Sequence, residues 1–279
     1  MTVGVRGISP LRRMLRLRAF RPVTSLVKRY VDEKIRAVTG LVPNTQFAED
    51  DVFIVGYMKS GNNWFRTLVA GVIYGADPES TPHSVILDLV PNHGPRKPYY
   101  KRYSTPMFFK SHYFPRPEYK RVIYLLRDGR DVMVSYLHHV SALQNREIDF
   151  LRLVQGDEGL PGQWHAHVET WLSNPFQAQM IVIKYEDLKN DPVNELRRFC
   201  AFVGAERDDA FLELMVQKAS FEKMQQKEAR SGLSMRDWPR DKFFVRRGQV
   251  GSYKDEMPPE VLEVFLREAG GTLRKLGYL

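Results

Sequence analysis

The feature that most constrains the fold is Asp51–Tyr74, where a short apolar run precedes a glycine-containing loop and a helical pattern. The run Val52–Val55 is rich in β-branched and aromatic residues, which is typical of a buried strand. The loop Gly56–Gly61 carries one lysine, Lys59. Apolar residues then recur at helical spacing, at Phe65, Leu68, Val69, Val72 and Ile73. Because the start of such a helix presents free N–H groups and a positive dipole end, we predict an anion-binding loop here.

The loop departs from the nucleotide-binding P-loop pattern. Gly56 and Gly61 have the required separation, but Asn62 and Asn63 stand where that pattern has Lys and Ser or Thr. The lysine precedes the second glycine, and no hydroxyl group follows to bind Mg²⁺. Asn62 is an acceptable N-cap for the helix. An Mg²⁺-dependent kinase or NTPase therefore remains only an alternative.

The remaining chain alternates between strand and helix patterns. Further strands are predicted at Met107–His112, Arg121–Arg127 and 180–185. Helices are predicted after Asp128 and around Trp164–Leu172, and at 192–203, 208–217, 222–227 and 259–276. This order favours an α/β fold with a central parallel sheet flanked by helices, whose ligand binds at the carboxyl ends of the strands. Four side chains follow such ends, namely Lys59, His112, Arg127 and Tyr185.

Two local interpretations accompany this fold. Asp128 is predicted to cap a helix, with Asp131 in the reciprocal position of a capping box. The proline-rich segment 77–106 is predicted to be irregular and to form a wall of an acceptor pocket through Tyr99, Tyr100 and Tyr103. Loops at 144–163 and 229–245 are expected to complete that pocket.

Charge and cysteine content set the cellular context. The single cysteine, Cys200, excludes an intramolecular disulfide and is interpreted as a core thiol, so we expect a cytoplasmic protein. No apolar run reaches the ~18 residues that a membrane-spanning helix needs. Residues 1–36 hold ten Lys or Arg and two acidic residues, so most of the net charge of +9 lies there. Because the excess belongs to an arm, nucleic acid is not a predicted partner.

The predicted domains are a basic helical arm at 1–45 and a single domain at 46–279. Ser9 and Pro10 can start a helix, and a second helical pattern runs from Val23 to Val38. Two interpretations of the arm remain open. It packs its apolar stripe on the domain, or it lies peripherally on an anionic membrane surface.

Four separated motifs resemble the cytosolic-type sulfotransferases. They are Tyr57–Trp64 for the family's YPKSGTTW, Lys110–His112 for K-T-H, Arg127–Ser135 for R-x-x-[RK]-D-x-x-x-S, and Arg246–Gly251 for R-K-G-x-x-G. The resemblance implies that 3′-phosphoadenosine 5′-phosphosulfate (PAPS) is the sulfuryl donor and that both of its anionic ends are bound.

The resemblance assigns the donor-binding residues. The 5′ end maps onto Lys59, Ser60, Gly61, Asn62, Asn63 and Trp64, and the 3′-phosphate onto Arg127, Ser135, Arg246, Arg247 and Gly248. Tyr185, Ser220, Phe221 and Met224 are expected to contact the nucleotide. Guanidinium groups suit phosphate geometry because they donate two parallel hydrogen bonds.

The resemblance also implies the chemistry. His112 is expected to be the general base for a hydroxyl or amine of a small-molecule or lipid acceptor, while Lys59 and Lys110 neutralise charge on the sulfuryl and bridging oxygens. No metal is implied. His165 and His167 project to different faces of a helix, so they do not predict a zinc site.

The resemblance is incomplete at the family's dimer motif. Pro258 and Pro259 replace its Thr-Val pair between Lys254 and Glu263, so the oligomeric state stays undecided. The sequence does not identify the acceptor. A catalytically silent nucleotide- or membrane-binding module is the remaining alternative.

Overall fold

The structure is a computed structural model that describes residues 21–94, 97–156, 162–232, 238–239 and 241–279. The helix proposed to start at Ser9 lies outside these residues. Among the described helices, none has the length and apolar character needed to cross a membrane. The chain forms two compact units, one from Met1–Gln46 with Pro95–Arg102 and one from Phe47–Gly94 with Tyr103–Leu279.

The first unit combines one helix with a two-stranded sheet. Helix α2 (Arg21–Thr39) is followed by β1 (Leu41–Pro43), which pairs antiparallel with β3 (Tyr99–Lys101). The hydroxyl group of Tyr99 donates to Asp32 and that of Tyr100 to the carbonyl of Gln46. The interpretation of 77–106 as irregular is therefore wrong, because backbone pairing orders 99–101.

The second unit is built on a parallel sheet, which confirms the predicted fold class. Its strands are β2 (Val52–Gly56), β4 (Phe108–Ser111), β5 (Arg121–Leu126) and β6 (Gln179–Lys184), in the order β4-β2-β5-β6. All three pairings are parallel, as the strand–helix alternation predicts.

The helices described in this unit are α3 (Asn62–Tyr74), α4 (His83–Leu89), α5 (Gly129–Gln144), α6 (Phe150–Gln155), α7 (Trp164–Ser173), α8 (Tyr185–Asn190), α9 (Pro192–Val203), α10 (Asp209–Lys218), α11 (Phe221–Ser231), α12 (Tyr253–Glu256) and α13 (Pro259–Lys275). Seven of them, α3, α5, α7, α9, α10, α11 and α13, lie close to their predicted positions. Helices α4, α6, α8 and α12 were not predicted, because each is shorter than two helical periods and leaves no clear helical repeat in the sequence.

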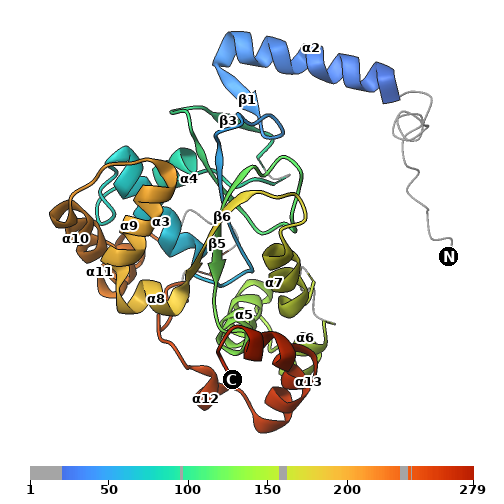
Figure 1. The fold of residues 1–279 in the computed structure, drawn as a ribbon, viewed down its shortest axis with the longest axis vertical. Helices are drawn as coiled ribbons and strands as arrows, with labels where there is room; N and C mark the ends of the chain where they lie inside the picture. The colour runs from blue at the N-terminus through green and yellow to red at the C-terminus, as the bar shows by residue number, and fades with distance from the viewer. Residues whose placement is uncertain (1–20, 95–96, 157–161, 233–237, 240) are drawn as a thin grey trace, which may run out of the picture. The chain divides into compact units, whose positions relative to one another are not determined.

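The sheet is covered on both faces, so its strands are continuously apolar. Figure 1 shows α3, α9, α10 and α11 on one side and α5, α6, α7 and α13 on the other. Alternate residues of β2 point to opposite faces. Ile54 lies in a core cluster with Phe65 of α3 and Phe199 of α9, whereas Phe53 stacks on Tyr119 with ring centroids 4.1 Å apart. Cys200 is buried in the first of these cores, as predicted.

Candidate active site

Four strand ends meet at one edge of the sheet. Val55 lies opposite Ser111, Gly56 opposite Leu125, and Leu126 opposite Lys184. The residues that follow these ends, on the β2–α3 loop, after β4, after β5 and at the start of α8, are therefore neighbours in space. The topology predicted this convergence, and the register confirms it for the backbone that carries Lys59, His112, Arg127 and Tyr185.

The loop before α3 has the backbone of an anion-binding turn. Lys59 has φ +68° and Gly61 has φ +91°, both in the left-handed region that strongly favours glycine. Asn62 was predicted as the N-cap of α3, but the N-cap is Gly61. The Asn62 side chain instead donates from Nδ2 to the carbonyl of Tyr57, at 2.9 Å. The first turn of α3 leaves N–H groups without intrahelical partners, and Lys59 adds a cation beside them.

Gly61 is required by a close contact as well as by its φ. A Cβ atom at this position would lie 2.7 Å from Cδ2 of Tyr185. The Tyr185 ring also lies 5.9 Å from the ring of Trp64, at an edge-to-face angle of 72°. Three of the predicted nucleotide-binding residues are thereby brought together at the start of α3.

Lys59 lies in a cationic and aromatic environment. Its Nζ is 3.8 Å from the ring centroid of Phe244. Burial, followed by the guanidinium groups of Arg127 and Arg246, lowers the pKa of Lys59 to about 7. Burial and the neighbouring cations destabilise the charged form of Lys59. A bound anion would stabilise that charged form, so the environment of Lys59 favours anion binding.

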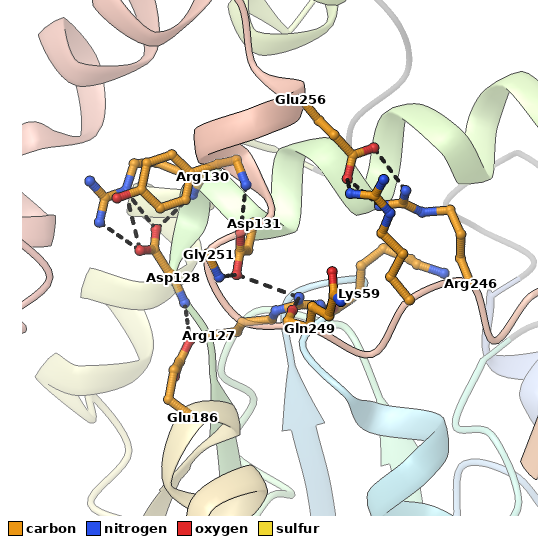
Figure 2. Close-up of polar contacts among 12 residues, drawn as sticks. Lys59, Arg127, Asp128, Arg130, Asp131, Glu186, Arg246, Gln249, Gly251 and Glu256 are labelled. Carbon is orange, nitrogen blue, oxygen red and sulfur yellow. Dashed lines mark hydrogen bonds and ion pairs between the residues drawn. The ribbon is translucent and has the colours of Figure 1, made fainter. Parts of the chain in front are cut away.

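Arg127 connects the β2–α3 loop to the segment that contains Arg246 and Gln249 (Figure 2). Its side chain is buried, with Nη1 donating to the carbonyl of Lys59 at 3.2 Å and Nη2 to the carbonyl of Gln249 at 2.9 Å. The guanidinium carbon lies 4.2 Å from the ring centroid of Tyr185. Its Nε has no hydrogen-bond partner among the described residues. A buried cation with spare donor capacity thus lies where the two predicted phosphate-binding loops meet.

The predicted capping box at the start of α5 is half wrong. Asp128 does cap the helix, since its side chain accepts from the N–H of Arg130. Asp131, however, accepts from the N–H groups of Gly251 at 2.7 Å and Tyr253 at 3.0 Å, while Glu186 accepts the N–H of Asp128. Figure 2 shows the buried Asp131 carboxylate directed at the distant loop and not back along its own helix. Asp131 therefore fixes the segment that carries Arg246.

The two arginines of that segment share one carboxylate. Arg246 donates through both Nη atoms to Glu256, at 2.8 and 3.0 Å, and Arg247 donates to the same carboxylate at 2.9 Å. Nε2 of His138 lies 2.8 Å from Glu256 as well. Burial of the carboxyl group is outweighed by these partners, so the pKa of Glu256 lies below its usual value. An anion thus already occupies the guanidinium groups for which a phosphate was predicted.

His112 is oriented by the backbone of β2. Its Nδ1 lies 2.7 Å from the carbonyl of Gly56, and a carbonyl only accepts, so Nδ1 carries the proton and Nε2 is the free acceptor. Burial, then the Lys110 ammonium, holds the pKa of His112 well below its usual value. The pKa of Lys110 is also well below its usual range, through burial and the nearby cations Arg66 and Lys59. The site therefore keeps the His112 imidazole neutral and places the cationic side chains of Lys110 and Arg66 close to it.

The remaining predicted residues lie on α3, α5 and α11 and in the segment that carries Gly248. Nε1 of Trp64 donates to the carbonyl of Ala219, one residue before Ser220, which caps α11 through the N–H of Lys223. A Cβ on Gly248, which has φ +60°, would clash with the Phe221 ring. Ser135 and Met224 are half-buried on α5 and α11, and for neither is a side-chain hydrogen bond recorded among the described residues.

Two buried side chains near the lysines were not predicted as site residues. Arg66 of α3 is 1% exposed, hydrogen bonds to Asn92, and has no carboxylate within ion-pair distance among the described residues. His139 of α5 is buried and stacks on Trp238 with ring centroids 5.3 Å apart. Burial, then Lys59 and Lys110, lowers its pKa to about 3. No sequence signal marked either residue, because both follow from packing between distant segments.

Metal-ligating side chains do not gather in the described part of the chain. No group of three or more His, Cys, Asp or Glu residues there has the geometry to hold an ion. His167 is fully buried and lies 3.0 Å from the Tyr124 hydroxyl through Nδ1, which gives it a packing role.

Comparisons with known proteins agree with this geometry. A family model described as the sulfotransferase domain matches residues 49–276. The 3-beta-hydroxysteroid sulfotransferase of Cavia porcellus is 27% identical over 78% of this chain and 81% of its own, and the amine sulfotransferase of Oryctolagus cuniculus is 25% identical over 80% of each.

Solved structures share the fold. A mouse sulfotransferase, SULT7A1, complexed with PAP has a TM-score of 0.62 at 21% identity, over 83% of this chain and 87% of its own. A retinol dehydratase in a complex with retinol and PAP has a TM-score of 0.64 at 19% identity, over 82% and 83%. Because the family model matches most of its length, this chain belongs to the sulfotransferase family and is an enzyme of that class.

Proposed function

We propose that the enzyme transfers a sulfuryl group from PAPS to a hydroxyl or amine of a small-molecule or lipid acceptor. The observation that carries this proposal is the position of Arg127. Its guanidinium bonds to the backbone of the Lys59 loop and to that of the Arg246–Gly251 segment, so one buried cation links both predicted anion-binding loops. A donor that is anionic at both ends of its nucleotide matches this pair of loops.

The residues present fit such a donor. The N–H groups at the start of α3 and the Lys59 ammonium would hold the 5′-phosphosulfate. Arg127, Ser135, Arg246, Arg247 and Gly248 would hold the 3′-phosphate. The fit is supported by two buried donor atoms that lack a partner among the described residues, Nε of Arg127 and Oγ of Ser60. Two solved structures that share this fold are complexes with PAP.

The chain's own part in the transfer is proton removal and charge neutralisation. Nε2 of His112 accepts the proton of the acceptor hydroxyl or amine as its oxygen or nitrogen attacks sulfur. The S–O bond to the nucleotide phosphate breaks, and its electron pair leaves with the nucleotide. Lys59 and Lys110 stabilise the charge on the sulfuryl and leaving oxygens. The lowered pKa of His112 keeps the base unprotonated at neutral pH.

The class of acceptor rests on the relatives and on the side chains near Lys59. Curated relatives are named for a hydroxysteroid and for amines. In this chain the aromatic rings of Phe244 and Trp238 pack on His139, and Phe244 also covers Lys59. An apolar acceptor with one nucleophilic group suits such a wall.

A donor-transfer assay tests the proposal. The full-length enzyme is incubated with isotopically labelled PAPS and a panel of alcohols, phenols, sterols and amines, and products are read by mass spectrometry. We expect donor-dependent sulfation of at least one acceptor. His112→Ala should lower turnover by about 10²–10⁴-fold, since that is the usual contribution of a general base. Its affinity for adenosine 3′,5′-bisphosphate, measured by calorimetry, should stay unchanged. Full activity in His112→Ala would contradict the assignment.

A further inference from the structure

Helix α2 carries an apolar surface that its own unit leaves uncovered. We call it the apolar stripe, and it consists of Leu26, Val27, Tyr30, Val31 and Val38, which are 66, 58, 61, 43 and 84% exposed. Pairs of these positions are one, three, four or seven residues apart, which places all five side chains on one side of the helix. Five large exposed apolar side chains on one side of a single helix form a contiguous patch, and such patches mark interaction sites.

The same helix is anchored by a different side. Asp32 is 8% exposed and accepts a hydrogen bond of 2.8 Å from the Tyr99 hydroxyl, within the first unit. At 100° per residue, Asp32 lies about 160° from the centre of the apolar stripe. The unit therefore holds α2 by a polar residue and turns the stripe outward, which is the reverse of an ordinary amphipathic helix.

The exposed charge on α2 is mostly positive. Lys28, Arg29, Lys34 and Arg36 are exposed, and the only exposed acid on α2 is Glu33, which pairs with Arg29 at 3.1 Å. Lys34 lies 5.5 Å from the ring of Tyr30. The sequence before residue 25 adds six arginines and no acid. At 100° per residue, Lys34 lies within the apolar stripe, and Lys28, Arg29 and Arg36 lie about 120–160° from its centre. A helix that combines an exposed apolar side with this excess of basic residues complements an anionic lipid interface.

We propose that α2 binds the surface of an anionic bilayer, with the apolar stripe at the boundary between headgroups and acyl chains. Tyr30, at the middle of the stripe, suits that boundary because its ring is apolar and its hydroxyl is polar. Within its own unit, α2 is anchored through Asp32 and not through the stripe, which leaves the stripe available for a lipid surface. The proposal is independent of sulfuryl transfer.

Vesicle sedimentation of the full-length protein tests the proposal. Vesicles of phosphatidylcholine alone are compared with vesicles that contain about 30% phosphatidylserine, at low and at 0.5 M salt. We expect binding to the anionic vesicles and a loss of binding at high salt, because the lipid charge is screened. Replacing three stripe residues by glutamine, a good helix former, should lower the partition coefficient by roughly tenfold or more. This variant is Leu26→Gln/Val27→Gln/Tyr30→Gln.

A matched variant controls for the loss of exposed apolar surface in general. It removes three exposed apolar residues from the second unit, as Val85→Gln/Leu172→Gln/Leu214→Gln, and should bind vesicles like the wild type. Circular dichroism confirms that both variants remain folded. Equal binding of the stripe variant and the wild type would overturn the proposal. So would a wild type that ignores lipid and instead forms dimers through the stripe, or a stripe variant that unfolds at lower urea concentration, which would show that the stripe packs on the rest of the chain.

Discussion

Replacing Asp131 by asparagine tests whether this buried carboxylate holds the arginine-bearing segment in place. The carboxylate has no exposed surface, accepts two backbone N–H groups and lies 3.6 Å from Nη2 of Arg127. An amide keeps one acceptor oxygen and turns an NH₂ group toward the second N–H. Losing a hydrogen bond to a charged group costs about 1.5–3 kcal/mol.

Arg127 adds to this loss, because it is buried and its nearest carboxylate disappears. Its two hydrogen bonds to carbonyl groups remain, so the contribution is well below the ~3–5 kcal/mol of a broken buried ion pair. We therefore expect a total of about 3 kcal/mol. The segment 246–253 can detach locally, so the loss should appear mainly as weaker binding of adenosine 3′,5′-bisphosphate, by about 100-fold, and less in global unfolding.

Calorimetry with the bisphosphate and urea unfolding measure the two effects. Asp209→Asn makes the same chemical change in an exposed ion pair with Arg197, and should cost less than about 1 kcal/mol in unfolding and nothing in binding. If Asp131→Asn binds the bisphosphate like the wild type and unfolds within 1 kcal/mol of it, the assigned role of Asp131 is wrong.

Two further predictions concern the β2–α3 loop. Gly61→Ala should weaken donor binding and lower the free energy of unfolding by more than the ~1–2 kcal/mol of left-handed strain, because its Cβ meets the Tyr185 ring at 2.7 Å. Gly75→Ala is the control, since Gly75 has φ +69° and open space around it. This control should show the strain alone in urea unfolding and should bind the donor normally. For pH, the charged form of Lys59 is lost as pH rises through its pKa of about 7, so kcat/KM for the donor should fall above pH 7, and Lys59→Arg should move that fall to higher pH. On the acid side kcat/KM should stay flat to well below pH 6.5, because the lowered pKa of His112 keeps it neutral, and a fall centred at pH 6.5 would contradict this.

The sheet and the placement of its strand ends were predictable because the signals are local. Val52–Val55 and Arg121–Leu126 are continuous apolar runs, and parallel pairing then fixes which residues meet. The loop before α3 could be located for the same reason, since Gly56, Lys59 and Gly61 are close in sequence.

The contacts that organise the site were not predictable from local patterns. Asp131 fits a capping box, but its partners Gly251 and Tyr253 lie about 120 residues further on. Glu256 follows the arginine motif without any pattern that would mark it as their carboxylate partner. His138 and His139 are consecutive residues of α5, and His138 is exposed whereas His139 is buried. Packing of His139 against Trp238 decides which of the two is buried.

The central claim is that Arg127 and the Arg246–Gly251 segment recognise a 3′-phosphate while the Lys59 loop holds the 5′ end. The most direct test is calorimetric binding of adenosine 3′,5′-bisphosphate and of adenosine 5′-monophosphate to the wild type and to Arg127→Ala. The account predicts that the variant loses most of its affinity for the bisphosphate and little of its affinity for the monophosphate. Equal losses for both nucleotides would contradict the assignment of the 3′-phosphate to Arg127.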